Sequence, residues 1–231
     1  MYDKINITFG GDIMSLLFSL ILKDAIIMAS DSRTTYTYKN KPPKYVDTTY
    51  KTVIMDNKIG ISHCRNASCN GKTITEHLYD FMEKNKGKAL SRIPKLLKEY
   101  FNNLCPTLDV VFLICGYDST NKPRFYRVYT KGDIENGGQL VPGQAFWEGE
   151  RTVCSKLFSP TYIRKGSYYE LHSDYPCLVK NYDVYDAVKY INFAFKATQE
   201  YMSFYECNQT VGGPIDILVL KPDFYYWYQK K

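Results

Sequence analysis

Two short apolar runs, separated by only two charged residues, constrain the fold of this chain more than any other feature. They cover residues 15–22 and 25–30, with Lys23 and Asp24 as the break between them. Each run is too short for a typical helix, and a continuous apolar run that ends at a turn is typical of a strand buried on both faces. The two runs therefore predict a buried β-hairpin.

The next apolar segments predict a second strand pair and then helices. Residues 52–55 and 59–64 have the pattern of two strands, with a turn over residues 56–58. Apolar residues at helical spacing predict three helices, which we place near residues 74–82, 90–104 and 184–205. The last of these stripes is the longest, at about six turns.

Strands return between and after the helices. Further apolar runs predict strands over residues 110–115, 124–129 and 215–220. Gly212, Gly213 and Pro214 stop the long helix before the last of them. Adjacent antiparallel strands with segregated helices indicate an α+β fold. No linker or repeat divides the chain, so we expect one domain over residues 15–231.

The charge of the chain gives no sign of a nucleic-acid partner. Its 30 basic and 24 acidic residues leave a net charge of +6, spread along the sequence. No cluster of Lys and Arg alternates with aromatic residues on one face, as a nucleic-acid surface would require. A solvated surface is the simpler interpretation, and we expect no nucleic-acid partner.

The start of the chain has some features of a secretory signal. Residues 13–22 are apolar apart from two serines and have the length of a signal-peptide core. However, Asp3 and Asp12 stand where a signal needs positive charge, and Lys23 ends the run too early for a membrane helix. We therefore expect a cytoplasmic protein that does not enter the membrane.

Cysteine usage agrees with a reducing compartment. The seven Cys residues are odd in number and include no CxxC pair, so we expect no disulfide framework. His63, Cys64 and Cys69 do not have the spacing of zinc ligands. The apolar and aromatic stripes of the predicted helices are explained by a protein core. We expect neither a metal nor a cofactor.

Three segments resemble the β-type subunits of proteasomes, in the order in which that family has them. Residues 19–33 resemble the first hairpin, residues 51–62 the next strand pair, and residues 212–219 the late strand after the long helix. Residues 210–216 resemble in particular the version found in bacterial proteasome-like proteins of the Anbu type. Together the resemblance covers residues 15–222.

This resemblance implies an N-terminal-nucleophile hydrolase with a four-layer αββα sandwich, in which helices cover two central antiparallel sheets. Members of the family assemble into rings that enclose a proteolytic chamber. The resemblance therefore implies a threonine- or serine-type endopeptidase that acts on polypeptides within a homo-oligomeric ring. The sequence does not indicate whether an ATPase is a partner.

The resemblance also assigns catalytic residues. The family's nucleophile lies 16 residues before the Asp of its Asp-Ser-Arg motif, and counting back from Asp31 gives Ser15. In this class the α-amine of the nucleophile is the base, and its pKa of about 7.7–8.0 suits proton transfer at neutral pH. Lys51 matches the catalytic Lys, whose charge favours the neutral amine, and Asp31 matches the acid that pairs with it.

Other positions depart from the family's pattern. Arg65 stands where the family has a Gly whose backbone N–H donates to the oxyanion. Asn208 stands where it has a supporting Asp, Val211 replaces a nearby Ser, and residues 147–150 offer no clear match for another supporting Ser. His63 falls where a residue of the specificity pocket is expected, which implies a preference for polar or acidic side chains.

Each assignment has a purely structural alternative. Ser15 is also explained as the first residue of a strand, and Lys51 as a surface residue beside one. Asp31 and Arg33 are also explained as a capped turn with a local ion pair. A Ser in place of the usual Thr lacks the methyl group that restricts the rotamer. The alternatives to a peptidase are a non-catalytic proteasome-like structural subunit and another acyl transfer on the same fold.

A catalytic Ser15 needs a free α-amine, so we interpret residues 1–14 as a leader or propeptide. The family's propeptides end in Gly, whereas residue 14 is Met. Alternatively, translation starts at Met14 and a methionine aminopeptidase exposes Ser15. Residues 10–12, Gly-Gly-Asp, can be encoded by a ribosome-binding sequence, which fits a misassigned start.

Overall fold

The predicted hairpin lies inside a five-stranded sheet. In the computed structural model, which describes residues 15–38, 41–159, 161–173, 179–205 and 208–231, β1 (Leu16–Ile21) pairs antiparallel with β2 (Ile26–Asp31). The order of strands in this first sheet is β12 (Ala145–Gly149), β1, β2, β15 (Ile215–Leu220) and β16 (Tyr225–Gln229). Every residue of β1 and β2 is buried, as central strands with two covered faces require.

A second five-stranded sheet packs against the first. Its strand order is β11 (Ile134–Asn136), β10 (Pro123–Tyr129), β9 (Val110–Tyr117), β6 (Ile59–Arg65) and β5 (Thr52–Met55). One apolar cluster joins residues of both sheets, among them Met28 from the first and Leu113 from the second. A Cβ atom at Gly60 would lie 2.3 Å from the Met28 sulfur, so a larger residue there would have to displace the Met28 side chain between the sheets.

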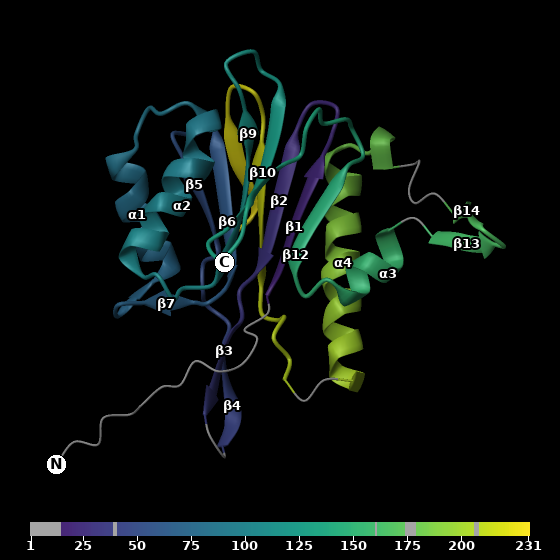
Figure 1. Cartoon of the computed structure of the whole chain (residues 1–231), viewed down its shortest axis with the longest axis horizontal. Helices are drawn as coiled ribbons and strands as arrows, with labels where there is room; N and C mark the ends of the chain where they lie inside the picture. Colours follow the sequence, from purple (N-terminus) through teal and green to yellow (C-terminus); the bar gives the residue numbers. More distant parts are fainter. Residues whose placement is uncertain (1–14, 39–40, 160, 174–178, 206–207) are drawn as a thin grey trace.

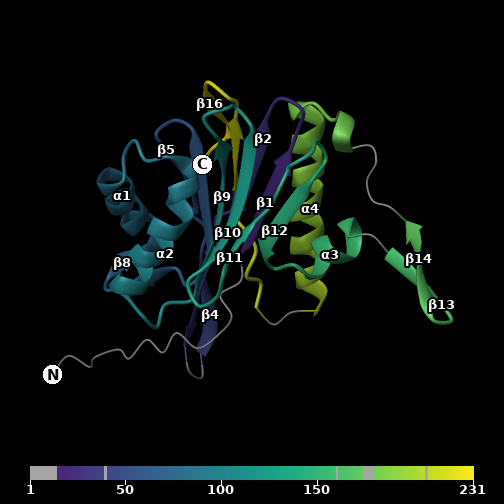
Figure 2. The ribbon, with the colours of Figure 1, turned by 45° about the horizontal axis from the view of Figure 1, so that its top comes forward.

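Helices cover the outer faces of the two sheets (Figures 1 and 2). α1 (Ile74–Lys84) and α2 (Ile93–Leu104), with the short 3-10 helix η1 (Leu90–Arg92), bury their apolar stripes against the second sheet. α3 (Thr152–Phe158) and α4 (Val184–Tyr205) do the same against the first sheet. α1 begins with a capping box between Thr73 and Glu76, which satisfies backbone donors of its first turn.

Three small ribbons and a short 3-10 helix complete the described chain. Each ribbon is an antiparallel pair. The pairs are β3 (Thr34–Tyr38) with β4 (Lys41–Val46), β7 (Ser68–Cys69) with β8 (Lys72–Thr73), and β13 (Thr161–Lys165) with β14 (Tyr168–Ser173); the 3-10 helix is η2 (Val179–Asn181). Figures 1 and 2 show the β13–β14 ribbon beyond α3, away from both sheets.

Most of the predicted elements are confirmed, and the chain is a mixed α/β protein with four α-helices among its described residues. The hairpin, the strand pair at residues 52–64 and the limits of α4 agree with the sequence pattern. One difference is that 215–220 is not the last strand: residues 225–229, for which the sequence pattern predicted no strand, form β16, the edge strand beside β15. The leader over residues 1–14 lies outside the described residues.

Within the part of the chain that the structure describes, no helix has the length and apolar character needed to cross a membrane. The longest helix, α4, is amphipathic: Phe195 is fully buried against the first sheet, whereas 54% of Phe193 is exposed.

This difference between the two faces of α4 gives a stability test. We expect Phe195→Ala to lower the free energy of unfolding by about 3–5 kcal/mol, because it removes a buried ring and leaves a cavity. Phe193→Ala, two residues away on the exposed face, should change it by less than about 0.5 kcal/mol. Urea unfolding of both variants measures the difference, and equal losses would contradict the placement of the two faces.

Candidate active site

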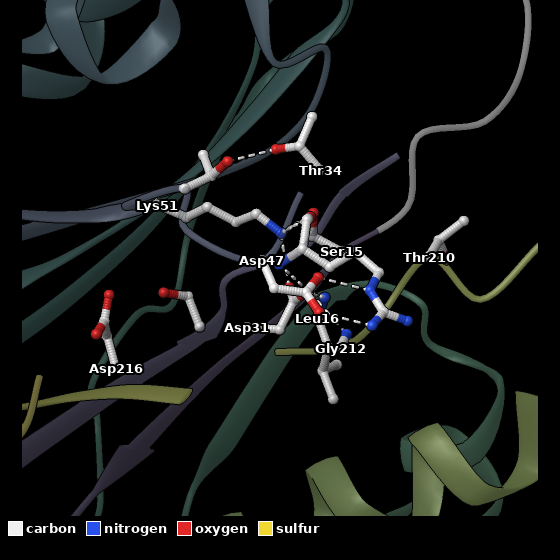
Figure 3. A network of polar contacts seen from close by, with 12 residues as sticks. Ser15, Leu16, Asp31, Thr34, Asp47, Lys51, Thr210, Gly212 and Asp216 are labelled. Atoms are coloured by element: carbon white, nitrogen blue, oxygen red, sulfur yellow. Dashed lines mark hydrogen bonds and ion pairs between the residues drawn. The ribbon is translucent and has the colours of Figure 1, made fainter. Parts of the chain in front are cut away.

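Three polar side chains meet at the end of the two sheets (Figure 3). The Lys51 ammonium lies 2.7 Å from Ser15 Oγ, 2.9 Å from Asp31 Oδ1 and 2.5 Å from the carbonyl oxygen of Arg33. Ser15 immediately precedes β1 and Asp31 ends β2, whereas Lys51 immediately precedes β5 of the other sheet. Ser15, Asp31 and Lys51 are at most 3% exposed, so the site is a buried junction between the sheets.

The Asp31 carboxylate is held by the backbone as well as by Lys51. Its Oδ1 accepts the amide of Leu16 at 3.0 Å. Its Oδ2 accepts the amides of Arg33 at 3.1 Å and Gly212 at 3.2 Å. A fully buried carboxylate is costly unless such donors replace water. The four contacts therefore fix Asp31, and Asp31 in turn fixes the Lys51 ammonium beside Ser15.

Gly212, in the glycine motif before β15, makes backbone contacts with Asp31 and Ser32. Besides the Gly212 amide, the Gly212 carbonyl accepts the amide of Ser32 at 3.2 Å. A Cβ atom at Gly212 would lie 2.3 Å from the guanidinium carbon of Arg33, so a side chain there would have to displace the Arg33 guanidinium. Arg33 itself pairs with both oxygens of Asp47 at 2.7 Å, a partner that the sequence analysis did not identify.

Residues 147–150 contact Ser15 through their backbone. The amide of Glu150 donates to the carbonyl oxygen of Ser15 at 2.7 Å. Gly149 has a φ of 87°, and a Cβ atom there would lie 1.7 Å from the same Ser15 oxygen. A glycine, with its positive φ, is what this backbone contact requires.

Burial dominates the electrostatics of Lys51. Loss of solvent lowers the pKa of its ammonium, while the charge of Asp31 and the hydrogen bond to Asp31 act in the opposite direction, and the net shift is downward. A lysine with a lowered pKa beside a hydroxyl is a common feature of sites where protons move.

Arg65 lines the same small pocket as Ser15, Lys51 and His63. Its φ is 75°, a conformation that favours glycine, and the family to which we compared the sequence has a Gly at this position. Its guanidinium contacts both oxygens of Asp109 at 2.8 and 3.0 Å and lies 4.0 Å from Glu148. The side chain is therefore held by carboxylates at the pocket.

Asn208 is not part of this cluster. It is exposed, and it makes no hydrogen bond with any residue in the described part of the chain. Gly212 is the residue of this region that contacts Asp31. The structure thus brings together Ser15, Asp31, Lys51 and Arg65, and the supporting role of Asn208 stays a prediction.

His63 presents a neutral ring to the pocket. It is 2% exposed, and its Nε2 lies 3.0 Å from the hydroxyl of Thr75, which in turn donates to the carbonyl oxygen of Tyr50. Burial, together with the charge of Lys51, lowers the pKa of His63 to about 3. His63 therefore offers hydrogen bonding to a ligand but no positive charge at neutral pH.

The described residues form neither a metal-binding cluster nor a disulfide bond. No group of three or more His, Cys, Asp or Glu side chains there is arranged to hold a metal ion. The five described cysteines, Cys64, Cys69, Cys105, Cys115 and Cys154, are free thiols. Cys177 and Cys207 lie outside the described residues.

Known proteins match this chain through the fold. No protein-family model and no curated protein sequence matches it. A structure of a (Gly-1) mutant of Anbu from Hyphomicrobium sp. strain MC1 has a TM-score of 0.64 at 16% identity, over 94% of this chain and 86% of that one. A second structure of Anbu from the same strain has a TM-score of 0.61 at 15% identity, with the same coverage. The fold is therefore similar to that of Anbu, a bacterial proteasome-like protein, as residues 210–216 predicted.

The buried neutral His63 predicts a pH dependence of stability. Its pKa is about 3 in the folded chain, against an ordinary value of 6.5, so between these values the unfolded chain binds a proton that the folded chain does not. Stability should therefore fall as the pH drops below 6.5, by about 1.4 kcal/mol per pH unit from this group.

His63→Gln keeps a polar group near Thr75 but cannot take up this proton. We expect the free energy of unfolding of the variant to fall less steeply than that of the unchanged chain when urea unfolding is measured at pH 6.5, 5.5 and 4.5. Parallel pH profiles for the two proteins would show that His63 is not a buried neutral group.

Proposed function

We propose that this chain is a proteasome-like N-terminal-nucleophile peptidase with Ser15 as its nucleophile. The observation that carries the proposal is the position of the Lys51 ammonium, 2.7 Å from Ser15 Oγ and 2.9 Å from a fully buried Asp31. The similarity of the fold to Anbu supports it. We interpret the two packed sheets and their covering helices as the four-layer αββα sandwich of this class.

In the proposed reaction, removal of residues 1–14 gives Ser15 a free α-amine. The amine takes the proton of Ser15 Oγ as this oxygen attacks the carbonyl carbon of a peptide bond. The same proton then passes to the leaving amine of the peptide. Water resolves the remaining ester by the reverse route, which restores the hydroxyl and releases the acid.

Two other residues have roles in this reaction. The Lys51 charge favours the neutral form of the nearby α-amine, and it stabilises negative charge that develops on Ser15 Oγ. The backbone N–H of Arg65 is the proposed donor to the oxyanion of the substrate, in the place of the family's glycine. Asp31 holds Lys51 in position and does not exchange protons with the substrate.

The assembly is part of the same proposal. We infer a homo-oligomeric ring in the cytoplasm that encloses its polypeptide substrates, by analogy with the proteasome-like fold. The support is the fold similarity and the exposed aromatic residues of the described chain, which include Tyr162, Tyr168, Tyr169 and Phe224 and are candidates for contacts between subunits.

A non-catalytic structural subunit is the alternative, and two observations favour it. The Arg65 side chain lines the pocket where the family has a glycine, so it narrows the approach to Ser15. Asn208, the position of the family's supporting Asp, is exposed. In this alternative Ser15 stays within the chain, and the fold serves assembly.

The N-terminus separates these two functions. We would express the native gene with its upstream region and determine the intact mass and the N-terminal sequence. A chain that begins at Ser15 has the free amine that the reaction requires. A chain that begins at Met1 or Met14 lacks it, and would support the structural subunit.

Ser15→Ala should reduce peptide hydrolysis by about 10³-fold or more, because it removes the attacking oxygen. The matched control is Ser19→Ala, another buried serine of the same segment with no hydrogen bond to Lys51 or Asp31 among the described contacts. The control should keep its activity. Equal activity of the two variants would show that any hydrolysis observed does not use Ser15.

A further inference from the structure

A second buried ion pair lies near the candidate site. The ammonium of Lys231 contacts Asp216 Oδ2 at 2.7 Å, and the backbone amide of Lys231 donates to Asp216 Oδ1 at 3.0 Å. Asp216 is fully buried on β15, and the Lys231 side chain is 9% exposed. Lys231, two residues after the end of β16, therefore contacts both oxygens of a carboxylate in the first sheet.

This second pair is connected to the first through neighbouring strands. Asp216 lies opposite Ser30 in the register of β15 and β2, so it is one position away from Asp31. The hydroxyl of Thr52, the residue after Lys51, donates to Ser30 Oγ at 2.9 Å. Figure 3 shows Asp216 on β15 in the same region of the molecule as Lys51 and Asp31.

Lys231 also holds the residue that precedes Lys51. The hydroxyl of Tyr50 donates to the carbonyl oxygen of Lys231 at 3.1 Å. The Lys231 ammonium lies 4.6 Å from the centre of the Tyr50 ring, within the range of a cation–π contact. The backbone of the next residue, Lys51, is held by β6, because the amide of His63 donates to the Lys51 carbonyl oxygen at 2.9 Å.

A buried ion pair of this kind needs an explanation other than stability. Removing two charges from water costs several kcal/mol per ion, and well-packed apolar residues often stabilise a fold as well. We propose that Lys231, held by Asp216, is a positioning residue for Lys51: it holds Tyr50, two residues before β5, and sets the charge around the Lys51 ammonium.

The electrostatics of Lys51 support this role. The positive charge of Lys231 lowers the pKa of Lys51, in addition to the larger effect of burial and against the effect of Asp31. Besides Asp31 and Lys231, the groups that act on Lys51 are Asp47 before β5, and His63 and Cys64 on β6.

These other groups do not change charge near or above neutral pH. Burial lowers the pKa of His63 to about 3 and raises that of Cys64 well above its usual value, and the hydrogen bond from Arg33 lowers that of Asp47. Their charges are therefore constant over a titration of Lys51 above pH 6, and a shift of its midpoint when Lys231 is replaced reports the loss of the Lys231 charge. The role in catalysis rests on the proposed function, but a test that observes Lys51 itself does not require turnover.

The test is a titration of Lys51 by NMR of the Cε resonances in the full chain with ¹³C-labelled lysine. Lys51→Arg, which loses the signal but keeps the charge, assigns the resonance. Lys231→Met should move the titration midpoint of Lys51 upward and lower the ratio of free amine to ammonium at fixed pH by roughly threefold, because a neighbouring cation is lost.

Two further variants keep the result interpretable. Lys231→Gln loses the charge but keeps a donor for Asp216, so it gives the same upward shift if Lys231→Met does not fold. Lys230→Met is the matched control: Lys230 is exposed and its ammonium lies over the rings of Tyr50 and Trp227, with no ion pair to a described residue. It should leave the midpoint unchanged.

An unchanged Lys51 midpoint in the folded Lys231 variants would overturn the inference, and so would an equal shift in Lys230→Met. Peptide hydrolysis is measured separately on the same proteins. If the unchanged chain hydrolyses no peptide but the midpoint still moves as expected, the proposed function fails while the positioning role stands.

Discussion

The ion pair between Lys51 and Asp31 is the interaction on which the structure of the candidate site depends. Neither charge is accessible to water, so each would cost several kcal/mol without its partners. The three backbone donors to Asp31 come from the start of β1, the turn after β2 and the segment before β15. Asp31 has all of these donors only when the three segments, which are far apart in the sequence, lie next to one another in the folded chain.

Apolar periodicity was sufficient to predict the centre of the fold. β1 and β2 are continuous apolar runs, and α4 is a long amphipathic stripe, so burial and local pattern agree in them. The pattern failed at the periphery. The strand β12 and the ribbon of β13 and β14 carry no continuous apolar run. β12 pairs with β1, which is distant in the sequence, and β13 and β14 pair with each other as a local hairpin.

The site was predictable to the extent that side chains define it. Ser15, Asp31 and Lys51 were found because the resemblance includes their side chains and spacing, and the structure brings them together. Gly149 and Asp47 were missed for two different physical reasons. Gly149 acts by the absence of a Cβ atom, which leaves no chemical signature. Asp47 acts through a pairing with Arg33 that exists only in the folded chain.

The energetic cost of the site bears on the choice between a peptidase and a structural subunit. A subunit that serves assembly alone gains nothing from a desolvated lysine beside a serine hydroxyl, since apolar residues would fill the same space at lower cost. A second buried lysine, Lys231, in the same region raises that cost because the two like charges disfavour each other. Reaction chemistry at Ser15 gives a physical reason for both lysines, which is why we prefer the peptidase.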